Sequence, residues 1–81
     1  MRIPRDISGE QLAKLLDNYG YIKTRQIGSQ VRLTTHKNGE HHLTIPLHKT
    51  IRVGTLNGIL KDAADHLSID KEVLIAELFS N

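Results

Sequence analysis

The sequence predicts an α+β fold in which two helices cover one face of a three-stranded antiparallel sheet. An amphipathic helical pattern opens the chain, strand-like runs separated by turn signals fill its middle, and two further helical patterns follow. The predicted architecture is therefore a two-layer sandwich of α-β-β-β-α order with a short C-terminal helix. We expect residues 1–81 to form a single domain, with a core over about 4–67 and a helical extension over 68–81.

The first helix is predicted over about 8–19. Ser8 is a suitable N-cap, and Gln11 stands three residues later, which is the spacing of a capping box. Apolar residues then recur at helical spacing and predict one buried stripe: Leu12, Leu15, Leu16 and Tyr19. Gly20 is expected to end the helix in the left-handed conformation.

Three strands are predicted next, at about 21–27, 30–36 and 41–46. The first is rich in β-branched and aromatic residues, and Gly28-Ser29 separates it from the second. In the second and third strands apolar and polar residues alternate, which is typical of strands with one buried face.

This alternation predicts the register of the hairpin around Asn38-Gly39. A two-residue loop would pair Leu33 with Thr44 and mix the faces, whereas a three-residue loop pairs Leu33 with Leu43. Because a slip of one residue moves every side chain to the other face, we predict the three-residue loop, with Gly39 in the left-handed bulge position. The outer face of the hairpin is then polar and partly cationic: Gln30, Arg32, Thr34, His42 and Thr44.

Two helices are predicted in the second half of the chain. Gly54-Thr55 is expected to open the first and Leu67 to end it, while Asp70 caps the second. The apolar stripe predicted for the second of these helices consists of Val73, Leu74, Leu78 and Phe79. The two longer helices cover one sheet face and leave the polar face open, which is the arrangement of double-stranded-RNA-binding domains. Fold order alone does not assign a function.

Charge is distributed unevenly along the chain, although the net charge is only +2. Between residues 21 and 55, Glu40 is the single acidic residue among many basic ones: Lys23, Arg25, Arg32, Lys37, Lys49 and Arg52. This middle segment favours an anionic partner, and an unevenly charged solvated face is the simpler alternative.

Several classes of protein are disfavoured by composition. The chain has no cysteine, which excludes disulfides and thiolate metal sites. No apolar stretch approaches the roughly 20 residues of a membrane span, and no signal peptide follows Met1. We therefore expect a cytoplasmic protein without a membrane segment.

Six short motifs follow one another between about Pro4 and Leu67. They are Ser8-Gly9-Glu10-Gln11-Leu12, Tyr19-Gly20-Tyr21, Arg25-Gln26-x-Gly28-Ser29, Asn38-Gly39, Thr44-Ile45-Pro46-x-His48 and Gly54-Thr55-Leu56-x-x-Ile59-Leu60. In this order they resemble the HicA (YcfA-like) toxins, small bacterial and archaeal mRNA interferases with a double-stranded-RNA-binding-like fold. The resemblance implies a metal-independent endoribonuclease without a cofactor, an mRNA substrate, and a HicB-type antitoxin that neutralises the toxin by covering its RNA-directed surface.

The chain departs from this family at one position. The family reads Gly-Ser-His after the break between the first two strands, and that histidine carries RNA cleavage, whereas this chain has Gln30 there. Glutamine forms hydrogen bonds but does not titrate near working pH, as histidine does. Loss of such a proton-transfer group typically lowers the rate by a factor on the order of 10²–10⁴. For Arg25, Gly28, Ser29 and Arg32, the resemblance implies RNA binding.

Three explanations of Gln30 stay open: a deliberately disabled protein, a naturally altered member, or a base relocated to His42 or His48. The histidines near the hairpin end (His36, His41 and His42) have no fixed acidic partner, which is a poor zinc pattern, so we expect most of these side chains to be solvated and no metal site. The alternative functions are a non-enzymatic RNA-binding or antitoxin-binding regulatory module and, third, a structural interaction protein.

Overall fold

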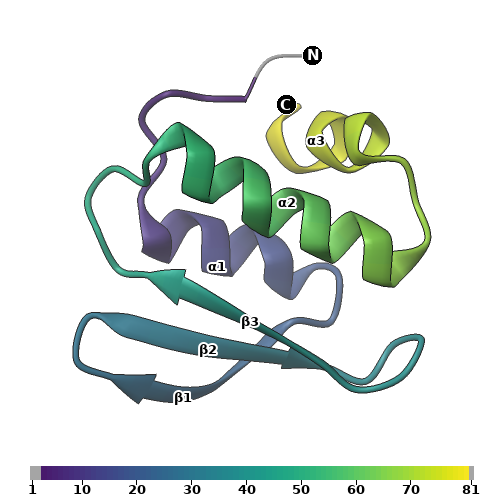
Figure 1. Cartoon of the computed structure of the whole chain (residues 1–81), viewed down its shortest axis with the longest axis horizontal. Coiled ribbons are helices and arrows are strands. Elements are labelled where there is room, and N and C mark those ends of the chain that lie inside the picture. The colour runs from purple at the N-terminus through teal and green to yellow at the C-terminus, as the bar shows by residue number, and fades with distance from the viewer. Residues whose placement is uncertain (1–2, 81) are drawn as a thin grey trace.

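The structure is a computed structural model that describes residues 3–80. Its elements are α1 (Gly9–Asp17), β1 (Ile22–Ile27), β2 (Gln30–Thr35), β3 (His41–Pro46), α2 (Val53–Leu67) and α3 (Lys71–Phe79). The sheet is antiparallel with strand order β1-β2-β3, so the predicted α+β fold is confirmed. In Figure 1 the sheet forms one layer, α1 and α2 lie together on one side of it, and α3 lies beyond them.

The start of α1 follows the predicted capping box. The Ser8 hydroxyl accepts from the Gln11 backbone N–H at 3.1 Å, and the Gln11 side chain accepts from the Ser8 N–H at 2.9 Å. The helix ends at Asp17, two residues earlier than predicted, and Asn18 is its C-cap. Gly20 supplies the left-handed conformation, with φ +83°, in the turn that leads to β1.

The hairpin of β2 and β3 has the predicted register. Leu33 lies opposite Leu43, and Val31 lies opposite Ile45. Gly39 has φ +96°, as the bulge requires, and Asn38 also adopts a positive φ of 56°. The inner side chains of the two strands therefore meet the helices and leave the polar residues on the open face.

The hydrophobic core lies between the sheet and the helices. Its fully buried members come from every element except β1 and from two connecting segments: Leu12, Leu16, Tyr21, Val31, Leu33, Ile45, Ile51, Leu56, Leu60, Leu74 and Ile75. Two predictions about the helices were wrong. Helix α2 begins at Val53, with Arg52 as an N-cap that makes no side-chain hydrogen bond. In α3, Val73 is exposed and Ile75 is buried, because the face of α3 that packs on the core carries Leu74, Ile75 and Leu78.

Candidate functional site

A tight turn at Gly28-Ser29 joins β1 to β2. Ile27 pairs with Gln30, so the loop has two residues. Gly28 has φ +57° and Ser29 does not have a positive φ, which is the signature of a type II′ turn with glycine at its first position. This turn type matches strand twist, so it holds the two strands in a fixed register.

The same turn is fixed to the rest of the domain. The Ser29 carbonyl accepts from the Leu47 N–H at 2.6 Å, and the His48 carbonyl accepts from the Gly9 N–H at 3.0 Å. The β1–β2 turn, the loop after β3 and the first turn of α1 therefore meet at one end of the sheet. Gln30 is the first residue after this turn, and it pairs with Ile27 of β1 on one side and with Pro46 of β3 on the other.

An irregularity in β1 lies just before Arg25. The register shifts between Lys23 and Arg25, because Thr24 is an extra residue in the strand. The pairs between this bulge and the turn run without a break, so the turn already places Arg25 opposite Arg32 on the open face. Beyond the bulge Ile22 lies opposite Thr34 and Lys23 opposite Leu33, so the bulge turns Ile22 to the open face and Lys23 to the helix side, an example of a bulge that redirects side chains.

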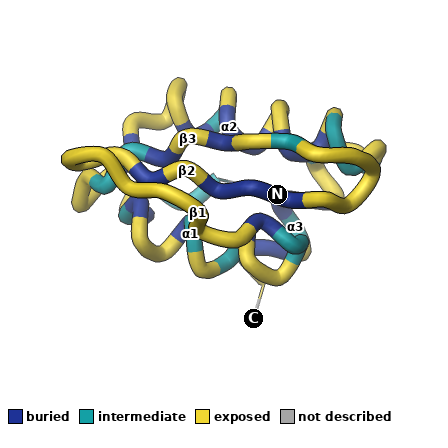
Figure 2. The backbone as a smooth tube through the Cα atoms, turned by 90° about the horizontal axis from the view of Figure 1, so that it is seen from below, coloured by how far each residue is buried: buried dark blue, intermediate teal, exposed yellow. Residues whose placement is uncertain are grey.

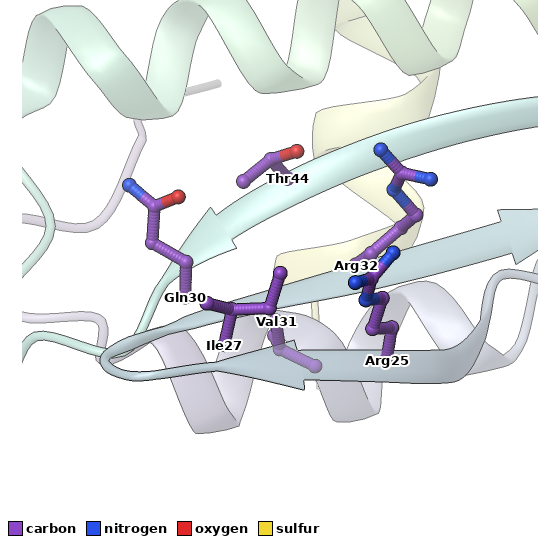
Figure 3. A pocket seen from close by; sticks show the side chains of 6 residues that line it. All are labelled: Arg25, Ile27, Gln30, Val31, Arg32 and Thr44. Atoms are coloured by element: carbon purple, nitrogen blue, oxygen red, sulfur yellow. The ribbon is translucent and has the colours of Figure 1, made fainter.

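Arg25 and Arg32 stand side by side on the open face of the sheet (Figure 3). Together with Ile27, Gln30 and Thr44 they line a shallow hollow of about 110 Å³. Figure 3 shows Gln30 nearer the turn and the two guanidinium groups farther along the strands. The structure thus brings together the predicted residues Arg25, Arg32 and Gln30.

The two arginines have no acidic partner in the described chain. Like charges directly opposite each other on a sheet are destabilising. The sequence has no Asp or Glu between residues 18 and 39, and among residues 3–80 no carboxylate pairs with either guanidinium. Their donors are therefore free for an external anion, and a guanidinium matches the geometry of a phosphate.

Gln30 is exposed, and its side chain makes no hydrogen bond within residues 3–80. Its amide is free to donate to a phosphate oxygen and to accept from a hydroxyl. Gly28 and Ser29 are likewise exposed, and no heavy atom lies within 4 Å of the place where a Gly28 side chain would start. The turn is thus open to a ligand that approaches Gln30.

The two other candidate bases lie at different ends of the sheet. His42 pairs with Thr34, four residues along β2 from Gln30, which is about 13 Å at the usual rise per residue. Both of its ring nitrogens are occupied: Nδ1 lies 2.9 Å from the Thr34 hydroxyl and Nε2 lies 3.0 Å from Glu40 Oε2. His48 is exposed; its carbonyl accepts from the Gly9 N–H, and the residue before it, Leu47, bonds to Ser29 in the turn that precedes Gln30.

Of the three histidines near the hairpin end, His36 and His42 are exposed, as expected for most of them, and His41 is the exception. Its ring stacks on His66 at 4.2 Å between centroids, its Nδ1 lies 2.9 Å from the Tyr21 hydroxyl, and its Nε2 lies 3.2 Å from Asp62 Oδ1. His66 Nε2 donates to the carbonyls of Lys37 and Gly39 at 2.7 and 3.0 Å. These contacts fasten the hairpin loop to α2 and have a structural role.

Two tyrosines have raised pKa values. Burial raises the pKa of Tyr21 to about 12, with a further contribution from the nearby Asp62 carboxylate. Burial raises the pKa of Tyr19 to about 12, together with the hydrogen bond that the Tyr19 hydroxyl donates to Glu77.

Within residues 3–80 no group of three or more His, Asp or Glu side chains is placed to hold a metal ion.

A family model described as the HicA toxin of bacterial toxin–antitoxin matches residues 9–64. This chain belongs to the HicA toxin family. No curated protein and no solved structure matches it. Membership in the HicA family implies that the chain is the toxin of a toxin–antitoxin pair and has a cognate antitoxin. The matched segment contains the whole sheet, including Arg25, Gln30 and Arg32.

Sequence reasoning missed some features of the open face. The bulge at Thr24 and the exposure of Ile27 are seen only in the pairing of β1 with β2. The sequence of β1 has no alternation of apolar and polar residues that would indicate which side chains face the helices. The turn signal at Gly28-Ser29 was visible, and counting pairs back from it would have placed Arg25 opposite Arg32.

Among residues 3–80, no helix combines the length and apolarity that crossing a bilayer requires.

Proposed function

We propose that this chain is the RNA-directed toxin of a HicA/HicB-type pair. The observation that carries the proposal is the pair of unneutralised arginines, Arg25 and Arg32, beside Gln30 on the open face of the sheet. Opposed cations without an internal anion weaken the sheet, so their placement is best explained by an anionic ligand. RNA supplies such a ligand through its phosphates, which position a protein on the chain without specifying sequence.

The proposed reaction is metal-independent cleavage of mRNA. Such cleavage needs a base for the ribose 2′-hydroxyl, an acid for the leaving oxygen, and cations that stabilise the charge on the pentacoordinate phosphorus. Arg25 and Arg32 would supply the cations. Gln30, at the family's histidine position, would hold a phosphate oxygen or a ribose hydroxyl but cannot take the proton.

We infer that the chain as it stands is a weak nuclease or an inactive one. The hydrogen bonds of Gln30 can orient a substrate, but the missing proton transfer typically lowers the rate by about 10²–10⁴. Of the two other candidate bases, His48 lies at the same end of the sheet as Gln30, whereas His42 lies at the far end with both ring nitrogens engaged. A residual activity would therefore depend on His48 more than on His42.

The proposed partner is a HicB-type antitoxin that covers the open face. An antitoxin that reached Arg25, Arg32 and Gln30 would block the RNA-binding surface directly. The second candidate function is a non-enzymatic module that binds RNA or antitoxin without cutting. Gln30 favours this alternative, since no histidine occupies its position.

RNA binding tests the proposal without depending on cleavage. We expect the chain to bind a labelled single-stranded RNA with an affinity that falls steeply as salt rises. Arg25→Gln and Arg32→Gln should each weaken binding and lower the salt slope by about one. Lys61→Gln is the matched control, because Lys61 lies on α2 and pairs with Asp65 at 3.0 Å. Equal effects of all three substitutions would overturn the assignment of the open face.

A further inference from the structure

Strand β1 is an uncovered edge of the sheet. It is an outer strand in the order β1-β2-β3, and all six of its residues are exposed. In Figure 2 the tube of β1 has the colour of exposed residues along its whole length, whereas β2 and β3 also contain buried residues. Edge strands are usually shortened, covered, bulged, charged or interrupted by proline, because their free backbone groups can pair with another chain. No proline interrupts β1, but it carries the bulge at Thr24 and the charges of Lys23 and Arg25, which disfavour pairing with a basic or neutral strand.

The turn geometry shows which backbone groups are free. The residues on either side of a two-residue hairpin loop bond to each other, so the backbone groups of Ile27 point toward β2. Along an antiparallel strand the N–H and C=O groups of successive residues point to opposite sides. Those of Arg25 therefore also point toward β2, and those of Gln26 point outward. The Gln26 N–H and carbonyl are thus a donor and acceptor pair on the open edge.

The side chains around this edge suit an extended peptide. On the open face Ile22 and Ile27 are 58% and 64% exposed, more than any other large apolar residue among residues 3–80. On the helix side a groove of about 380 Å³ runs between α1 and the sheet. Tyr21, Lys23 and Leu33 lie in its lining, together with charged residues of α1: Glu10, Lys14 and Asp17. A strand added to β1 would cover the isoleucines with one set of alternating side chains and enter the groove with the other.

Charge indicates the chemistry of the added strand. Lys23, Arg25 and the neighbouring Arg32 are basic, and no acidic residue lies between 18 and 39. Pairing of two copies of this chain through β1 would bring these cations together, which disfavours self-association. An acidic segment would neutralise them if its carboxylates lay on the side of Arg25 and Arg32, because the groove on the other side also contains Glu10 and Asp17.

We propose that the free edge of β1 binds an extended acidic segment of the cognate antitoxin as a fourth strand of the sheet. The inference rests on the proposed function only in taking the antitoxin as the source of that segment. A strand paired with Gln26 would lie beside Arg25 and next to the turn that carries Gln30, so the same segment would exclude RNA from the open face.

The test uses a synthetic peptide of alternating Glu and Val as a probe and records amide spectra of the whole chain by NMR. We expect shifts along β1, and the Gln26 amide should become protected from hydrogen exchange. Gln26→Pro removes the outward donor from an edge position that tolerates proline, and should weaken binding about tenfold. The control Gln26→Ala keeps the N–H and should change affinity by less than about twofold.

A second probe does not depend on how the proline variant folds. The same peptide with alternate backbone amides methylated keeps its charge but cannot complete the strand ladder, so it should bind more weakly than the unmodified peptide. Equal binding of the two peptides, or shifts without protection of Gln26, would mean simple charge attraction and would overturn strand addition. RNA binding measured on Gln26→Pro separates the proposals. If Gln26→Pro still binds RNA but no longer binds the peptide, both the proposed function and strand addition are supported. If the unaltered chain does not bind RNA, only the proposed function is overturned.

Discussion

Arg25 on β1 lies directly opposite Arg32 on β2, and no carboxylate within residues 3–80 pairs with either. A sheet selected for stability alone would place opposite charges or β-branched residues at such a pair. The arrangement is typical of a functional surface, where an unfavourable contact in the free protein becomes favourable once a ligand binds.

The first prediction concerns the stability of this pair. Arg25→Thr should raise the free energy of unfolding by about 0.2–1 kcal/mol, because it removes the like-charge contact and adds a β-branched residue. Urea denaturation at low and high salt measures the effect, which should shrink as salt screens the charges. A loss of stability at both salt concentrations would show that the aliphatic part of Arg25 contributes packing that outweighs the repulsion.

A second prediction concerns the contact between α1 and β3. A Cβ added at Gly9 would lie 2.1 Å from the Pro46 carbonyl oxygen, which is backbone and cannot turn aside. Gly9→Ala should therefore destabilise the domain by about 3 kcal/mol or more. Gly58→Ala is the matched control, since no atom lies within 4 Å of its added Cβ. In the middle of α2 this change should stabilise by about 0.5–1 kcal/mol. Thermal unfolding of both variants compares them, and equal effects would contradict the packing described.

A third prediction concerns the fastening of the hairpin loop by His66. His66→Ala removes the donor to the Lys37 and Gly39 carbonyls and the ring that stacks on His41. It should lower the free energy of unfolding by about 1–2 kcal/mol and speed hydrogen exchange in the loop. His36→Ala serves as the control, because His36 is an exposed residue of the same loop. A loop that exchanges at the same rate in both variants would argue against the fastening.

A fourth prediction concerns alkaline pH. The pKa of Tyr21 is raised from 10.0 to about 12 in the folded state, so the unfolded chain loses its proton first as pH rises. The contribution of Tyr21 to stability is full below about pH 10 and is lost progressively up to about pH 12. The free energy of unfolding should fall across this range, and less steeply in Tyr21→Phe. The same slope in both proteins would contradict the shift.

The sequence predicted those parts of the fold in which one face of an element is buried. Leu33 opposite Leu43 followed from alternation, because any other register would have exposed the apolar side chains. The bulge at Thr24 could not be predicted in the same way, because both faces of β1 are exposed and carry no pattern. The position of His41 was missed for another reason. Its partners Asp62 and His66 come from α2, and only the packing of that helix brings them to the strand.

The candidate site was predicted from the turn and from the family resemblance. Gln30, Arg25 and Arg32 do lie together, whereas His42 lies about 13 Å from Gln30 along the strand and has both ring nitrogens occupied. Sequence alone could not rank His42 against His48, because the ranking depends on the contacts between Leu47 and Ser29 and between His48 and Gly9. Those contacts join segments that are far apart in the chain.

RNA cleavage by this chain and by its Gln30→His variant tests the central claim most directly. The assay contains a metal chelator, and a third protein carries Gln30→His together with Arg25→Gln and Arg32→Gln. The account predicts that Gln30→His cuts faster than the unaltered chain by a factor of about 10² or more, and that loss of both arginines removes most of this gain. No cleavage by Gln30→His, or equal cleavage by Gln30→His and the unaltered chain, would contradict it.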